Sequence, residues 1–151
     1  MGTLDVKGQH LQGKKVYIDT SPFIYFVEGH SDFSEVIKPL FNLIDQEIFT
    51  ACTSQFTLTE LFIKPYREGF DELIRDYQGL LLESEKITLF SLNQETFLNA
   101  AQIGGTQGLR TPDAIHIASA LENQCEFFIT NDKRIRDYKS VRVIQISDFI
   151  P

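Results

Sequence analysis

The chain has 151 residues, a length that fits one domain able to bury a core without disulfides or structural metals. Hydrophobic residues make up 42% and charged residues 23%, so we expect a globular protein with no large disordered region. The formal net charge of −7 argues against indiscriminate binding to duplex nucleic acid, which needs many Lys and Arg contacts with phosphates.

The start of the chain predicts a leader followed by a strand and a helix. Residues 1–14 are polar and contain three glycines, which predicts a flexible leader. The run at 15–19 is rich in β-branched and aromatic residues and is typical of a strand. Ser21 is a favoured N-cap and Pro22 fits the first helical position, so we expect a helix over 23–28.

The middle of the chain continues the alternation. Its apolar spacing and composition predict, in order, a helix from 31 or 32 to 44, a strand over 48–53, and helices over 54–65 and 70–85. Pro39 lies inside the first of these helices and predicts a kink or break there. Ser54 is the expected N-cap of the next helix, and Pro65 lies near its end.

The last third of the chain predicts a strand over 87–92, helices over 94–107 and 111–123, and strands over 126–130 and 141–146. Gly104 and Gly105 are expected to interrupt the first of these helices, because glycine is a poor helix former. Thr111 as N-cap and Pro112 in the first turn mark a clear start for the second helix.

Strands separated by helices of this length predict βαβ units. The expected fold is therefore an α/β/α sandwich with a central parallel sheet of about five strands, formed by a single domain over 15–151. Cys52 and Cys125 each lie in an apolar run outside any CxxC pair, which predicts two reduced core thiols. With no signal peptide and no long apolar stretch, we expect a cytoplasmic chain without membrane contact.

Four acidic residues stand out by their predicted positions. Asp19 lies at the carboxyl end of the first strand, and Asp132 follows the apolar strand that ends at Thr130. Ligands of open α/β sheets bind outside the carboxyl ends of the strands. Asp113 lies in the first turn of a helix, where the helix dipole tolerates negative charge, and Glu60 lies in a helix beside apolar neighbours. Three of these acids are expected to converge at one edge of the sheet.

Each acid also has a structural explanation that its sequence position leaves open. Asp19 can be a turn residue, Asp113 a dipole partner, Asp132 part of an Asn-Asp turn, and Glu60 a solvated side chain. If they converge, their like charges need a cation, and an all-oxygen set suits Mg²⁺ or Mn²⁺ rather than zinc. Such an ion supports hydrolysis of a phosphodiester.

Three segments carry a resemblance to a known family: VYIDTSPFIYF at 16–26, TLTELF at 57–62 and TPDAIHIASALENQCEFFITND at 111–132. In this order they resemble the PIN-domain ribonucleases, and in particular the VapC-like toxins of bacterial toxin–antitoxin systems. The resemblance covers nearly the whole chain from Lys15 onward, and the third segment is its most specific part. The chain departs from the family in the Ser21-Pro22 pair and in its longer leader, but neither departure removes an acid.

The resemblance implies a PIN-like sandwich and cleavage of RNA that depends on Mg²⁺ or Mn²⁺. By motif, Asp19 and Asp113 would be the most direct metal ligands, and Glu60 and Asp132 would complete the site or act through bound water. The neighbours expected to hydrogen-bond water or phosphate are Thr130, Asn131 and Thr20 or Ser21.

A toxin of this kind implies a protein antitoxin that covers the site, and a homodimer is also expected. Aromatic residues near the early helices either form one of these interfaces or belong to the core: Phe23, Tyr25, Phe26 and Phe33.

Basic residues gather beyond the last acid, where five of the fourteen lie within ten positions: Lys133, Arg134, Arg136, Lys139 and Arg142. They either form a solvated loop that offsets nearby acids or supply the cations that an RNA backbone needs at the mouth of the site. Lys64 and Arg67 are candidates for its other side, and Tyr66 and Tyr138 are candidate stacking residues. Asp137 is either a peripheral fifth acid or an ion-pair partner of Arg134 or Lys133, and its neighbouring basic residues favour the ion pair.

His116 follows Asp113 by three residues, so the two side chains can share a helix face. A polar residue beside the site or the core is favoured over a metal-binding pair, since no other histidine is placed to help.

The alternative to an active ribonuclease is a catalytically inactive PIN-like module that binds RNA or protein, which the four retained acids disfavour. A dehalogenase-type phosphatase needs a second Asp two residues after the first, and position 21 is Ser.

Overall fold

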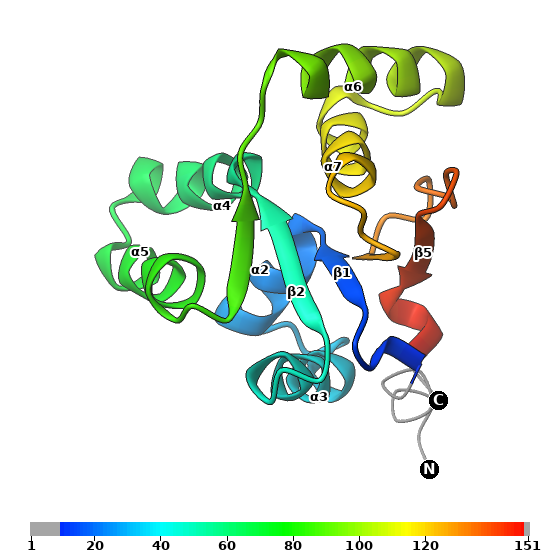
Figure 1. Cartoon of the computed structure of the whole chain (residues 1–151). Coiled ribbons are helices and arrows are strands. Elements are labelled where there is room, and N and C mark those ends of the chain that lie inside the picture. The colour runs from blue at the N-terminus through cyan, green and yellow to red at the C-terminus, as the bar shows by residue number, and fades with distance from the viewer. Residues whose placement is uncertain (1–9, 150–151) are drawn as a thin grey trace.

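The structure is a computed structural model that describes residues 10–149, and its centre is a parallel sheet (Figure 1). The strands are β1 (Lys15–Ile18), β2 (Thr50–Ser54), β3 (Ile87–Phe90), β4 (Phe127–Thr130) and β5 (Arg142–Gln145). They pair in the order β3-β2-β1-β4-β5, and every pairing is parallel. The predicted five-stranded parallel sheet is confirmed.

Helices cover both faces of this sheet (Figure 1). They are α2 (Thr20–Glu28), α3 (Ser34–Asp45), α4 (Gln55–Glu68), α5 (Asp71–Gln78), α6 (Gln94–Gln107) and α7 (Thr111–Glu122). A π-helical turn η1 (Gly79–Glu83) continues α5, and a 3₁₀ turn η2 (Ile146–Phe149) follows β5. The helix expected over 70–85 is therefore α5 followed by a widened turn.

Alternation along β1 divides the core between the two faces, because successive side chains of a strand point to opposite sides. Val16 and Ile18 join the apolar cluster that includes residues of α2 to α5. Tyr17 joins the second cluster, with α6, α7 and the buried ring of Phe128. The α/β/α sandwich predicted from the sequence is thus confirmed.

Predicted helix breakers do not interrupt their helices. Pro39 lies inside α3 and Pro65 inside α4, and both helices continue past them. The apolar stripe of α3 is buried in the core, and that burial outweighs the lost backbone hydrogen bond. Gly104 and Gly105 lie within a continuous α6. A Cβ at Gly104 would lie 3.4 Å from the carbonyl oxygen of Leu109, so this glycine permits close packing of the chain.

The starts of two helices also differ from the predictions. Asp19, not Ser21, is the N-cap of α2, and its carboxylate accepts a hydrogen bond from the backbone N–H of Thr20 at 2.8 Å. Arg110, not Thr111, precedes α7 as its N-cap residue and makes no side-chain capping bond. In each case the helix begins one or two residues earlier than the best capping side chain suggested.

The end of the predicted leader is part of the fold. Leu11 is fully buried in the core, and the Gly13 N–H donates to the Ile48 carbonyl oxygen at 2.8 Å. The positive φ of 75° at Gly13 suits a glycine at this turn. The expectation of a flexible leader is therefore wrong for residues 10–14, while residues 1–9 lie outside the described part of the chain.

Cys52 and Cys125 are both buried and free, as predicted. None of the helices within residues 10–149 has the length and hydropathy needed to cross a membrane.

Replacing the Phe128 side chain tests the core on the α7 face. Its ring is fully buried and stacks on Tyr17 with 5.1 Å between the ring centroids. We expect Phe128→Ala to lower the free energy of unfolding by about 3–5 kcal/mol, measured by urea denaturation. Phe97→Ala, at a ring that is 50% exposed, should change it by less than about 0.5 kcal/mol. Equal losses in the two variants would contradict this account of the core.

Candidate active site

The order of the strands creates a cleft beside β1. The chain runs outward from β1 through β2 to β3, and then returns to add β4 and β5 on the other side of β1. The segments that follow β1 and β4 therefore lead away in different directions, and open α/β sheets bind ligands at such a point. Asp19 follows β1, and Thr130 with its two successors, Asn131 and Asp132, ends β4.

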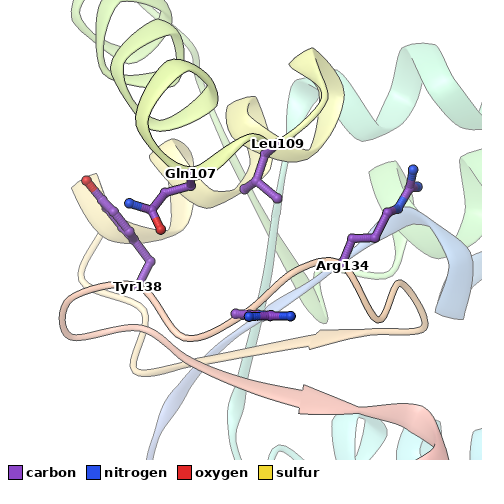
Figure 2. A pocket seen from close by; sticks show the side chains of 5 residues that line it. Gln107, Leu109, Arg134 and Tyr138 are labelled. Atoms are coloured by element: carbon purple, nitrogen blue, oxygen red, sulfur yellow. The ribbon is translucent and has the colours of Figure 1, made fainter.

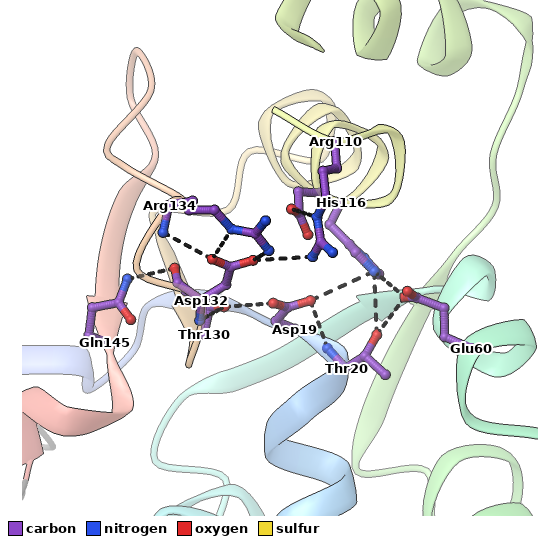
Figure 3. A network of polar contacts seen from close by, with 10 residues as sticks. Asp19, Thr20, Glu60, Arg110, His116, Thr130, Asp132, Arg134 and Gln145 are labelled. Atoms are coloured by element: carbon purple, nitrogen blue, oxygen red, sulfur yellow. Dashed lines mark hydrogen bonds and ion pairs between the residues drawn. The ribbon is translucent and has the colours of Figure 1, made fainter. Parts of the chain in front are cut away.

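All four predicted acids line one open cleft of about 410 Å³ at this place. Figure 3 shows three of them, Asp19, Glu60 and Asp132, with their polar contacts. Its lining residues are Asp19, Thr20, Ser21, Ile24, Tyr25, Glu60, Arg110, Asp113, Asn131, Asp132 and Lys133. Asp19 and Asp113 are the deeper acids, only 7% and 6% exposed. Segments that are far apart in the sequence thus bring their carboxylates to a common surface.

Asp19 is held by hydrogen bonds at both carboxylate oxygens. Oδ1 accepts from the Thr20 N–H, and Oδ2 accepts from the Thr130 hydroxyl at 2.6 Å. The same hydroxyl oxygen accepts a bond from the Asp132 N–H at 3.0 Å. Thr130 therefore ties the loop after β4 to the acid after β1, and it lies beside the cleft as the sequence suggested.

Glu60 reaches the cleft from α4 and is fixed by two partners. The Thr20 hydroxyl donates to Oε1 at 2.7 Å, and His116 Nε2 lies 2.5 Å from the same oxygen. Burial by itself raises the pKa of Glu60, but the hydrogen bonds and charge of His116 and the bond from Thr20 outweigh it and lower that pKa. Glu60 is therefore ionised at neutral pH.

His116 is a buried connector between the core and the cleft. Its side chain is 1% exposed, Nδ1 lies 2.6 Å from the Tyr17 hydroxyl, and Nε2 lies 3.7 Å from Asp19 Oδ1. Burial alone lowers the pKa of His116, but Tyr17, Glu60 and Asp19 together raise it above its ordinary value. The ring is thus the internal counter-charge of two acids, which agrees with a polar residue beside the site rather than with a metal ligand.

Arg110 is the cleft residue that the sequence reasoning missed. From the start of α7 its Nε lies 3.3 Å from Asp113 Oδ2, and its Nη2 lies 3.4 Å from Asp132 Oδ2. Burial raises the pKa of Asp113, Arg110 opposes that rise, and the charges of Asp132 and Asp19 add to it. The spacing of three residues before Asp113 at a helix start was the available signal.

Asp132 is held mainly by Arg134. Its carboxylate accepts from the Arg134 backbone N–H at 2.9 Å, from Nε at 3.0 Å and from Nη2 at 2.7 Å, and these contacts lower the pKa of Asp132. The predicted pairing of Asp137 with Arg134 or Lys133 is wrong. Asp137 instead pairs with Arg142 at 3.5 Å and accepts from the Val143 N–H.

Several residues expected near the site lie elsewhere. Lys64 pairs with Glu28 at 3.0 Å, and neither Lys64 nor Arg67 lines the cleft. Tyr66 lies in an apolar surface hollow of α4 with Phe62 and Ile63.

The aromatic residues of the early helices differ in how far they are buried. Phe23 is fully buried and belongs to the core, so it cannot form an interface. Tyr25 and Phe33 stack on each other and are half-buried, and Asn131 donates to the Tyr25 hydroxyl at 2.8 Å. Phe26 is 40% exposed.

Comparison with known families gives one match, to the PIN domain over residues 16–141. The chain belongs to the PIN domain family. The match begins at β1 and extends beyond the loop that carries Asp132, so it includes every acid of the cleft. No curated protein matches this PIN domain.

Solved structures share its fold. A toxin–antitoxin complex from Klebsiella pneumoniae is 18% identical with a TM-score of 0.64, and the alignment covers 83% of this chain and 94% of that one. VapBC2 from Rickettsia felis, bound to a DNA fragment from its promoter, is 11% identical with a TM-score of 0.68, covering 86% and 97%. DNA-bound VapBC from Salmonella typhimurium is 18% identical with a TM-score of 0.63, covering 88% and 98%.

The donor set of this PIN domain fits a hard divalent cation. The four acids offer only oxygen ligands, and the raised pKa of Asp113 reflects burial and carboxylates that nearby cations do not fully neutralise. Within residues 10–149, however, no three acidic, His or Cys side chains are already gathered closely enough to hold an ion. Arg110 lies between Asp113 and Asp132, with its nitrogens 3.3 and 3.4 Å from their carboxylate oxygens.

The connection through His116 can be tested by stability. His116→Leu leaves the Glu60 carboxylate and the Tyr17 hydroxyl without their shared partner, so we expect the free energy of unfolding to fall by about 1–3 kcal/mol. Urea denaturation in EDTA measures the change without a contribution from metal. Tyr17→Phe is the matched control, because it removes only the hydrogen bond from Tyr17 and leaves the His116 ring itself beside Glu60. A loss for His116→Leu no larger than for Tyr17→Phe would contradict the role of His116.

Proposed function

We propose that this PIN domain is a metal-dependent endoribonuclease and the toxin of a toxin–antitoxin pair. The observation that carries the proposal is the cleft itself, which Asp19, Glu60, Asp113 and Asp132 all line at the point where the strand order reverses. Family membership and the fold shared with VapBC complexes support the same function.

The acids would hold Mg²⁺ or Mn²⁺ in two ways. Asp19 and Asp113 are the proposed direct ligands, because they are the most buried of the four and face the same cleft. Glu60 and Asp132 complete the site or hold ion-bound water. The ion, when bound, supplies the positive charge that activates water and steadies the leaving oxygen at phosphorus.

The chain's own residues set up an in-line displacement. Thr20 and Thr130 fix both oxygens of Asp19, so that carboxylate loses little orientational freedom when it binds. His116 keeps Glu60 ionised, and that carboxylate is available to accept a hydrogen bond from the attacking water. The water oxygen bonds to phosphorus as the bond from phosphorus to the leaving sugar oxygen breaks. Lys133 lines the same cleft and offsets phosphate charge.

The proposed partners are RNA as substrate, a protein antitoxin and a second copy of the chain. Toxin–antitoxin complexes are among the structures that share this fold, and they support an antitoxin. Exposed apolar side chains are candidates for contact with a protein partner: Phe26 on α2, and Ile63 and Tyr66 on α4.

The ribonuclease proposal predicts that Asp19→Asn and Asp113→Asn each lower the rate of RNA cleavage by more than about 100-fold, because each removes charge that binds the ion. The assay is cleavage of a mixed RNA pool with Mn²⁺ or Mg²⁺, with the cut ends mapped. EDTA should abolish cleavage by the unaltered chain. Circular dichroism and urea denaturation check that the variants fold.

Asp45→Asn is the matched control, since Asp45 is an exposed acid on α3 outside the cleft, and it should cleave normally. Cleavage that survives EDTA, or that persists in Asp19→Asn, would overturn the proposal. RNA binding without any cleavage would instead identify a catalytically inactive binding module.

A further inference from the structure

A second cavity lies next to the acid cleft. We propose that it is a subsite for one nucleotide of single-stranded RNA, the nucleotide that flanks the bond to be cut. In this subsite Tyr138 stacks on the base and Arg136 contacts the phosphate. This inference rests on the proposed function, because it specifies that the RNA bound at the same site is single-stranded.

The cavity has a volume of about 370 Å³ and is formed by two separate segments (Figure 2). Gln107 and Leu109 come from the end of α6 and the turn that follows it, and Arg134, Arg136 and Tyr138 come from the loop between β4 and β5. In Figure 2, Gln107 and Tyr138 lie on one side, and Arg134 lies across from them. A volume above about 300 Å³ is in the range of small-ligand sites.

This cavity and the acid cleft share two stretches of wall. Leu109 lines the cavity, and its neighbour Arg110 lines the cleft. Likewise Arg134 lines the cavity, and its neighbour Lys133 lines the cleft. Because consecutive residues of both stretches line the two cavities, the cavity and the cleft adjoin each other, which is the arrangement that a strand of RNA crossing both would need.

The cations of the cavity are suited to phosphate. Arg136 is exposed and, within the described residues, makes no ion pair or hydrogen bond, so its guanidinium is free for an anion. Arg134 is already engaged by Asp132 and so joins this cavity to the catalytic acids. The chain has a formal net charge of −7, which repels a polyanion over most of the surface. A local group of arginines therefore favours the approach of a polyanion at this cavity.

The other walls are suited to a base. Tyr138 is half-buried and is positioned by two backbone hydrogen bonds with Val141, at 3.0 and 2.9 Å. Lys139 Nζ lies 5.4 Å from the centre of the Tyr138 ring, so a cation is also close to the stacking surface. Leu109 adds an apolar contact, and the exposed Gln107 amide can donate to and accept from a base edge.

These features favour single-stranded RNA over an acidic segment of a protein. Arginine alone would serve either ligand, whereas an aromatic ring beside an amide matches an unpaired base, which presents both a flat face and a hydrogen-bonding edge. A base within a duplex is already stacked on both sides, so a duplex would gain less from Tyr138.

The absence of tryptophan from the whole sequence gives a direct test. Tyr138→Trp introduces a single tryptophan, whose fluorescence is titrated with a single-stranded RNA oligonucleotide in EDTA, so that no cleavage occurs. We expect saturable quenching by the oligonucleotide and much weaker quenching by the corresponding duplex. Tyr66→Trp is the matched control, because Tyr66 is 62% exposed on α4 and lies outside both cavities, and it should not be quenched.

Affinity measurements on separate variants make the proposal independent of the tryptophan substitution. Tyr138→Ala should weaken binding of the oligonucleotide in EDTA by roughly 5- to 150-fold, the range found for loss of one stacked base. Arg136→Gln should reduce the magnitude of the negative slope of log affinity against log salt by about 0.7, as expected for one lost phosphate contact to a single strand. Arg75→Gln, at an exposed arginine on α5, is its control and should keep the slope unchanged.

The possible outcomes separate this inference from the proposed function. RNA cleavage that depends on Asp19, together with unquenched Tyr138→Trp and unchanged affinities, would overturn the subsite and leave the ribonuclease intact. Quenching and weakened binding without any cleavage would support the subsite and overturn the ribonuclease. Quenching by poly-glutamate equal to that by RNA would overturn the nucleotide assignment in favour of an acidic protein ligand.

Discussion

Repulsion between the four carboxylates is the constraint on which the rest of this site depends. Like charges brought together in a partly buried cleft raise one another's pKa, and the protein must offset that cost. It does so with side chains from several elements, placed so that each acid has at least one hydrogen-bond donor. The positions of the acids in the cleft therefore depend on the cations and hydrogen-bond donors that hold them.

The two sides of the cleft meet this constraint differently. Asp19 and Glu60 are held by buried, fixed partners, above all His116 and Thr130, so their positions are set before any ligand arrives. Asp113 and Asp132 face Arg110, whose side chain is 61% exposed and is free to rearrange. The partners on one side are thus buried, whereas those on the other side, Arg110 and Arg134, are exposed arginines.

Much of this architecture was predictable from local patterns. The strands and the four acids follow from short-range signals, namely apolar runs and the positions of acids at strand ends or in first turns. The failures share one cause, which is tertiary context. Pro39 and Gly104 are helix breakers in isolation, yet the packing of α3 and α6 overrides them. Leu11 looked like part of a leader because a single apolar residue gives no periodicity, although it is fully buried.

The contacts of the cleft were harder to predict than its acids. Sequence spacing could suggest that His116 and Arg110 lie near Asp113, but it could not reveal their distant partners, which are Glu60 for His116 and Asp132 for Arg110.

The bond between Tyr17 and His116 has a consequence for how this domain can change. Tyr17 is a fully buried residue of the central strand, and at most such positions any apolar side chain of suitable volume would serve. Here the phenol oxygen sets the orientation of the imidazole ring that holds Glu60. Replacing Tyr17 with phenylalanine would preserve the packing of the core but remove this hydrogen bond. The effect would pass through the His116 ring to Glu60 in the water-facing cleft. A redesign of this core should therefore keep Tyr17, because its hydroxyl supports the contacts of a cleft residue.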